Sequence, residues 1–283
     1  MTTHPHPGDV TANVRKILSE YLACGIDPEK AAIYVQSDVK EVLELYLYLN
    51  MNAYLGELQR VTSFKEKARK QPENVNAGLL TYPTLMAADI LIHRADKVPV
   101  GKDQEQNMEM ARKFARRFNT IYGVEFFPEP QSYSFGGDAI KVPGLDGSGK
   151  MGKSEGNAIY LIDDAATIRK KVMKAVTDSG PTQPNSEKPE AIANLFTMLK
   201  IVSSADTYDY FNEKYNACEI RYGDLKKQLA EDIVNFTSPI RERILAYAAD
   251  TEYMDKVARE GAEKARASAD KTIREVRKII GFN

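Results

Sequence analysis

The stretch from Gly78 to Gln104, GLLTYPTLMAADILIHRADKVPVGKDQ, constrains the fold of this chain most strongly. Its pattern predicts a helix, a short turn, a Val-Pro-Val strand and the start of a second helix. Tyr82-Pro83 is expected to open the first helix, because proline at the first helical position sacrifices no intrahelical hydrogen bond. The strand ends at Gly101 before a helix N-terminus, and α/β sheets bind ligands at such carboxyl ends of strands. A ligand site is therefore expected near Gly101.

One carboxylate stands on an apolar face of the first predicted helix. The residues that share this face at helical spacing are Tyr82, Met86, Asp89 and Ile90. Val98 and Val100 point to one side of the following strand, and Asp103 is expected to cap the next helix. A buried carboxylate needs a partner, and the local sequence offers no obvious one for Asp89. The residues alone leave two interpretations open: a ligand acceptor, or a helix carboxylate paired with a distant arginine.

The rest of the chain divides into an α/β part and a helical part. In the first part the pattern predicts helices at 9–24, 39–60 and 103–119 and strands at 32–36, 124–127 and 139–142. After residue 162 it predicts helices near 165–178, 189–202, 206–216, 219–236 and 239–280. Ser238-Pro239 is interpreted as the start of the last of these. The predicted architecture is a mostly parallel sheet with crossover helices, followed by an all-helical domain.

Composition excludes several classes of protein. No apolar run reaches the ~18 residues of a membrane span, and the first ten residues have no apolar core of a secretory signal. Two cysteines are too few for a disulfide framework, which favours a cytoplasmic protein. His4 and His6 lack further ligands for a metal site. The net charge of −1 carries no global signature of nucleic-acid binding.

Two further segments could contact phosphate. Gly144 to Asn157, GLDGSGKMGKSEGN, contains five glycines and two lysines three positions apart. Glycines let backbone amides approach phosphate and the lysines add positive charge; the alternative is a flexible surface turn. Ser63 to Lys70 is a basic cluster, for which a solvated helix end is the alternative.

The motifs YPTLMAADILI and VPVGKDQ resemble the amino-acid pocket of tryptophanyl-tRNA synthetases, a family of class I aminoacyl-tRNA synthetases. The segment 144–157 resembles the KMSKS loop of that class, with Gly152 where the family usually has serine. The two motifs lie in the family's order, and the resemblance runs from about Thr2 to the last residues. It implies a Rossmann-like catalytic domain at 1–162, a helical anticodon-binding-type domain at 163–255, and a C-terminal helix at 256–283 that packs back on the catalytic domain.

The resemblance also implies a reaction and its residues. Tryptophan is activated with ATP and transferred to tRNA(Trp) by a cytoplasmic homodimer. The implied tryptophan pocket consists of Tyr82, Met86, Asp89, Ile90, Val98, Val100 and Gln104. The implied ATP-binding residues are Lys67, Gly101, Lys102, Asp103, Val142, Lys150, Met151, Gly152, Lys153 and Ser154. Lys150, Lys153 and Ser154 are the implied catalytic residues, and Mg²⁺ accompanies ATP without a protein metal site.

The sequence departs from the family at one signature. The family's first strand, turn and helix carry an HIGH-like tetrapeptide, and none of the three histidines here lies in such a context. We therefore expect the chain to lack this N-terminal segment, and activity to depend on it. The alternatives are a tyrosyl-tRNA synthetase, which would want polar groups at Met86, and a non-catalytic relative that binds an amino acid or tRNA.

Overall fold

The computed structural model describes residues 7–133, 141–152 and 155–282, without the side chains of Pro7 and Lys102. The chain forms two compact units. Unit 1 comprises residues 1–18, 27–138 and 252–283, and unit 2 comprises residues 19–26 and 139–251. The functional domain limits expected at 162 and 255 stay predictions.

Unit 1 joins a small parallel sheet to several helices. Its elements are α1 (Pro7–Ala23, which runs into unit 2), η1 (Gln36–Asp38), α2 (Glu41–Asn50), α3 (Leu55–Leu58), α4 (Thr62–Lys70), η2 (Pro72–Asn74), α5 (Ala77–Leu91), β1 (Lys97–Pro99), η3 (Lys102–Gln104), α6 (Glu105–Tyr122), β2 (Gln131–Tyr133) and α11 (Thr251–Ile280). Strands β1 and β2 pair in parallel, with Val98 opposite Ser132. The predicted parallel α/β class is confirmed.

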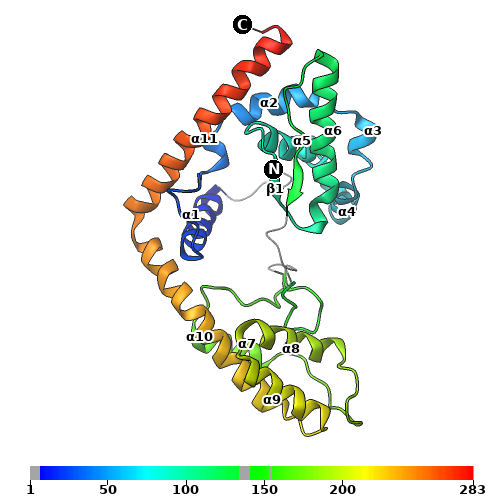
Figure 1. The fold of residues 1–283 in the computed structure, drawn as a ribbon, viewed down its shortest axis with the longest axis vertical. Coiled ribbons are helices and arrows are strands. Elements are labelled where there is room, and N and C mark those ends of the chain that lie inside the picture. Colours follow the sequence, from blue (N-terminus) through cyan, green and yellow to red (C-terminus); the bar gives the residue numbers. More distant parts are fainter. Residues whose placement is uncertain (1–6, 134–140, 153–154, 283) are drawn as a thin grey trace. The chain divides into compact units, whose positions relative to one another are not determined.

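The core of unit 1 forms around α5, which packs against α2 and α6 (Figure 1). Leu79, Ala87 and Leu91 of α5 are fully buried. Helix α6 turns Phe114 and Phe118 inward, as its apolar spacing predicts. The last helix, α11, adds a stripe to the same cluster: Ala265, Ala269, Ile273 and Val276. Burial of these side chains fixes α5, and α5 carries Asp89.

Two prolines lie inside helices rather than at their starts. Helix α5 begins at Ala77, because the Asn76 side chain accepts a hydrogen bond from the Leu79 amide (2.9 Å) and caps it. The prediction that Tyr82-Pro83 opens this helix is therefore wrong. Pro239 likewise lies within α10 (Tyr222–Ala249). The Ser238 hydroxyl donates back to the Val234 carbonyl (2.6 Å) and does not cap a new helix.

Predicted strands outside β1 also differ from the structure. Residues 124–127 form no strand, because the Asn119 side chain binds the backbone amides of Phe126 and Phe127 (3.2 and 3.0 Å). The second strand lies at 131–133 instead. Residues 32–36 are not a strand either. The chain turns into η1 there, because the backbone N–H of Asp38 donates a hydrogen bond to the Val35 carbonyl (2.9 Å). Residues 141–142 of the predicted strand 139–142 are irregular, and the others lie outside the described residues.

Two predicted helices also have different limits. The helix expected at 39–60 is interrupted after Asn50 and resumes as the short α3. The helix expected at 239–280 is divided at Asp250, which ends α10 before α11 begins.

Unit 2 is helical in its regular elements. Helices α7 (Ala165–Met173), α8 (Glu190–Val202), α9 (Ala205–Asn216) and α10 enclose a second apolar cluster, with Val172, Leu199 and Leu229 fully buried. Figure 1 shows α7 and α8 beside α10. The all-helical character predicted for this part is confirmed. Among the described residues of both units, no helix combines the length and apolar character needed to cross a membrane.

Candidate functional site

Four apolar side chains predicted for the amino-acid pocket contribute to the core of unit 1. Ile90 is 8% exposed and belongs to the core cluster, while Met86, Val98 and Val100 are partly buried and pack against it. Helix α5 supplies the first two, and β1 with the residue after it supplies the valines. Residues from a helix and from a strand that the sequence predicted for an amino-acid pocket thus pack against one core cluster.

Asp89 is half-buried, and its partner is a side chain that the sequence analysis missed. The Gln36 amide nitrogen lies 2.8 and 2.7 Å from the two Asp89 carboxylate oxygens. Burial raises the pKa of Asp89 above its usual value, and the Gln36 hydrogen bond opposes that rise. Among the described residues Asp89 makes no ion pair with an arginine, so the second interpretation of this carboxylate is not supported.

Tyr82 joins this face to the basic cluster of α4. Its hydroxyl hydrogen-bonds to Ser63, and the Lys67 ammonium lies 4.5 Å from the centre of its ring. Lys67 is exposed apart from this cation–π contact. The structure therefore places the predicted ATP-binding lysine next to a predicted tryptophan-binding residue.

The turn after β1 is held by its own side chains. The backbone N–H of Gln104 donates to the Gly101 carbonyl (2.9 Å). The side-chain amide of Gln104 donates to the Asp103 carboxylate (3.3 Å) and accepts from the Asn107 side chain (2.9 Å). A Cβ at position 101 would meet the Asp103 carboxylate at 2.7 Å. Asp103 does not cap α6, because its carboxylate folds back over Gly101. The side chain of Lys102 lies outside the description.

The Gly/Lys segment of unit 2 is organised by Asn157, which is 5% exposed. Its side chain accepts from the Gly152 amide (2.9 Å) and donates toward Asp146 (2.9 Å), Ser148 (3.0 Å) and the Lys150 carbonyl (3.1 Å). A side chain at Gly144 would overlap the Asn157 amide. These contacts argue against a merely flexible turn. Asn157 is the last residue of the segment 144–157, and an asparagine at that position did not by itself predict this role.

The residues predicted to bind phosphate differ from one another in burial and in contacts. Lys150 is exposed, and Val142 accepts from the Met151 amide (3.0 Å). The side chain of Met151 is partly buried against the helical core. A Cβ at Gly152 would meet Glu155 at 2.9 Å. Lys153 and Ser154 lie outside the described residues.

Changing Asn157 to alanine is expected to open the segment 144–157. Loss of the amide leaves the half-buried Gly152 N–H without its acceptor, at a cost of roughly 1 kcal/mol in the free energy of unfolding. Urea unfolding and limited proteolysis measure this change. The milder control is Asp146→Asn, because asparagine keeps an acceptor oxygen toward Asn157. Equal protease resistance in Asn157→Ala and the parent would contradict this role.

Several basic residues of α11 bind neighbouring parts of unit 1. Arg277 pairs with Glu44 (2.7 Å), Arg266 donates to the Asp38 carbonyl (2.7 Å) and Lys264 donates to the Pro28 carbonyl (3.0 Å). Arg274 pairs with Asp270 within the helix. These contacts favour a structural role for this face.

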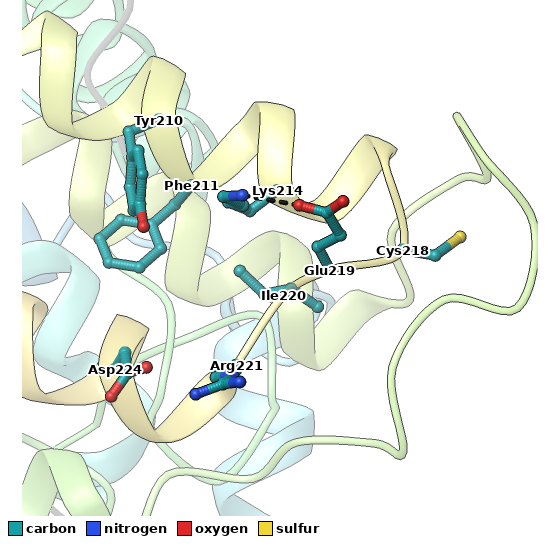
Figure 2. Close-up of a pocket in the computed structure, with 8 residues that line it drawn as sticks. All are labelled: Tyr210, Phe211, Lys214, Cys218, Glu219, Ile220, Arg221 and Asp224. Carbon is teal, nitrogen blue, oxygen red and sulfur yellow. Dashed lines mark hydrogen bonds and ion pairs between the residues drawn. The ribbon is translucent and has the colours of Figure 1, made fainter.

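A hollow of about 580 Å³ lies in unit 2 where α9 passes into α10 (Figure 2). Its lining consists of Tyr210, Phe211, Lys214, Cys218, Glu219, Ile220, Arg221 and Asp224. Lys214 and Glu219 form an ion pair on its wall (2.6 Å), which Figure 2 marks. Tyr210 is 56% exposed. None of the residues predicted from the sequence lines this hollow.

Comparison with known proteins identifies the family. The model for class I tRNA synthetases (W and Y) matches residues 1–238. The chain belongs to this family. It is 78% identical over 282 residues to tryptophan–tRNA ligase of Porphyromonas gingivalis, covering all of this chain and 86% of that protein. It is 41% identical over 272 residues to the Listeria monocytogenes enzyme of the same name, covering 95% of this chain and 80% of that protein.

A solved structure gives the same assignment within the class I tRNA synthetases. Tryptophanyl-tRNA synthetase of Campylobacter jejuni, complexed with ADP and tryptophan, superimposes with a TM-score of 0.87 at 32% identity. The match covers all of this chain and 86% of that chain. The resemblance inferred from the motifs around Asp89 and Lys150 is confirmed, and these relatives favour the tryptophan enzymes over the tyrosyl alternative.

Proposed function

We propose that this chain activates tryptophan with ATP and transfers it to tRNA(Trp) in the cytoplasm. The observation that carries the proposal is the Asp89 carboxylate on the apolar face formed with Met86, Ile90, Val98 and Val100. Relatives named tryptophan–tRNA ligase and a synthetase complexed with ADP and tryptophan support it. The products of the first step are tryptophanyl-adenylate and pyrophosphate.

Selection of tryptophan follows from the chemistry of the indole ring. Indole has one N–H donor on an otherwise apolar body, so Asp89 accepts that hydrogen bond while the four apolar residues enclose the ring. Tyr82 and Gln104 receive the amino group. A site whose buried acceptor is left unpaired rejects ligands that lack the donor by factors of order 10⁴. Tyrosine offers its hydroxyl at a different position and is excluded.

The ATP-binding residues contribute positioning and charge. We assign Gly101, Lys102 and Asp103 to the ribose and adenosine, Val142 to the adenine through its backbone, and Lys67 to the phosphates. Lys150, Lys153 and Ser154, with Met151 and Gly152 between them, hold the leaving pyrophosphate. The tryptophan carboxylate attacks the α-phosphorus, so no covalent enzyme intermediate forms. Stabilisation of the negative charge that leaves with pyrophosphate lowers the barrier.

Mg²⁺ is proposed to enter with ATP. Phosphate oxygens are preferred ligands of Mg²⁺, which keeps several waters and needs few protein ligands. Among the described residues, no three His, Cys, Asp or Glu side chains cluster as a metal site. When bound with ATP, the ion would neutralise phosphate charge.

Tryptophan-dependent exchange of radiolabelled pyrophosphate into ATP tests the reaction. The assay uses the chain preceded by a segment with an HIGH-like signature, since the resemblance implies that activity depends on it. Exchange with tryptophan and none with tyrosine is the expected result. Exchange with tyrosine alone would indicate the tyrosyl enzyme, and none with either would favour a non-catalytic relative.

The partners in an assembly are proposed to include a second copy of the chain. Helix α2 and the residues after it expose Leu43, Leu47, Met51, Tyr54 and Leu55, with Leu47 59% and Met51 76% exposed. Leucines and a methionine four residues apart form one stripe of the helix, and such a patch is typical of an interface. We propose that this stripe pairs the chain into a homodimer.

Substitution Leu47→Glu is expected to dissociate that dimer. A carboxylate buried without a partner disfavours association, and we expect the dimer Kd to rise by at least about tenfold. Sedimentation velocity across protein concentration measures it. The matched control is Leu245→Glu, which changes an exposed leucine of α10. A parent that is monomeric, or a Leu47→Glu dimer of unchanged Kd, would contradict the proposal.

A further inference from the structure

The segment before α2 is fixed in place by α11. Gly261 of α11 lies so close that a side chain there would overlap the Ile33 carbonyl. Lys264 and Arg266 donate to the Pro28 and Asp38 carbonyls at 3.0 and 2.7 Å. These contacts hold the backbone on both sides of η1, where Gln36 begins the turn.

Gln36 itself is exposed, but its amide reaches inward to Asp89. Its nitrogen lies within hydrogen-bond distance of both carboxylate oxygens, at 2.8 and 2.7 Å. This one donor therefore fixes the rotation of the carboxylate. Each oxygen keeps further lone pairs that can accept from another donor.

Tyr34 interacts electrostatically with Asp89, because burial together with the Asp89 charge raises the pKa of the Tyr34 hydroxyl. That hydroxyl hydrogen-bonds to His93 (2.9 Å), whose other ring nitrogen meets Ser268 of α11 (3.2 Å). Burial lowers the pKa of His93 and so favours the neutral ring. Among the described residues, Gln36 is thus the donor that stabilises the charged form of Asp89.

We propose that Gln36 is a positioning residue for amino-acid selection, which orients the Asp89 carboxylate so that a free lone pair faces the indole N–H of tryptophan. This inference rests on the proposed role of Asp89 as indole acceptor. Gln36 acts through Asp89 and belongs to a segment outside the helix–strand stretch that forms the apolar lining. Its contribution is to tryptophan affinity, and the attack on ATP does not involve it.

Loss of Gln36 has two expected consequences for binding. The carboxylate becomes free to rotate, so tryptophan affinity falls by about tenfold at neutral pH. Protonation of Asp89 also becomes easier, because the bond that favours its charged form is absent. Since protonated Asp89 is a poorer acceptor, the acid limb of the binding curve moves to higher pH.

The test is the Kd of tryptophan between about pH 5 and pH 9 for the parent, Gln36→Leu and Gln36→Glu. Gln36→Leu should weaken binding and move the acid limb upward, and Gln36→Glu should move it further because two carboxylates face each other. The matched control is Ser37→Ala, which changes an exposed neighbour in η1. It should leave the Kd at neutral pH and the position of the acid limb unchanged. A loss that is equal at every pH would indicate a structural effect and overturn the inference.

A double-mutant cycle separates this inference from the function on which it rests. In an Asp89→Asn background, Gln36→Leu should cause no additional loss. If Asp89→Asn leaves tryptophan affinity unchanged, the indole-acceptor role is wrong. If Asp89→Asn weakens binding while Gln36→Leu and Gln36→Glu behave as the parent, only the positioning role of Gln36 is wrong.

Discussion

Replacing Asp89 with alanine is expected to abolish tryptophan selectivity while leaving unit 1 folded. A hydrogen bond to a charged group contributes about 1.5–3 kcal/mol, so tryptophan affinity should fall by roughly 10- to 100-fold. The parent should reject an analogue with sulfur in place of the indole N–H by a factor of order 10⁴, and the variant by far less. Equilibrium binding of both ligands measures the two effects.

The fold is expected to survive this substitution because Asp89 does not stabilise it at neutral pH. Burial raises the folded-state pKa of Asp89, so the folded chain holds this proton more tightly than the unfolded chain. Ionisation therefore costs stability as the pH rises through the folded-state pKa, and alanine removes that cost. The control is Asp96→Ala, which removes an exposed aspartate of the same unit. An Asp89→Ala protein that still discriminated against the analogue as the parent does would refute the indole-acceptor assignment.

The second large effect is expected from Lys150→Ala combined with Lys153→Ala. Each lysine is proposed to hold negative charge that develops on pyrophosphate. Removal of one such contact typically slows catalysis by about 10²–10³-fold, and the pair should cost at least as much. Tryptophan binding should stay within about twofold of the parent, because the pocket residues belong to unit 1. Pyrophosphate exchange, in a chain preceded by an HIGH-like segment, separates the two effects.

A matched control for the lysine pair is Lys174→Ala, an exposed lysine of unit 2 at the end of α7. It tests whether loss of any positive charge in this unit slows exchange. Exchange that proceeds at the parent rate in the double variant would remove the segment 144–157 from the mechanism. Equal slowing by Lys174→Ala would point to a general electrostatic effect, which added salt would diminish.

Local sequence was sufficient to predict which apolar residues share a face of α5 and of the strand after it. The spacing of Met86, Asp89 and Ile90 fixes a shared helical face, and alternation fixes Val98 with Val100. The structure retains both groupings even though α5 starts five residues before Tyr82. Face and period depend on local geometry, which is why the wrong helix start did not disturb them.

Contacts that local periodicity does not encode could not be predicted from the sequence. Gln36 meets Asp89 across 53 positions, and Asn119 replaces a predicted strand by binding Phe126 and Phe127 with its side chain. A glutamine or an asparagine in the sequence does not by itself predict which groups its side chain will bind. Pro239 lies inside α10 although Ser-Pro favours a helix start, because tertiary packing of the flanking turns outweighs that preference.

The measurement that tests the central claim most directly is tryptophan binding to this chain, followed by the fluorescence of the ligand. The chain contains no tryptophan, so the protein adds no indole fluorescence to the signal of the ligand. We predict saturable binding of tryptophan that a hundredfold excess of tyrosine does not displace, and loss of that binding in Asp89→Ala. Displacement by tyrosine at equal concentration, or binding that Asp89→Ala leaves unchanged, would contradict the account.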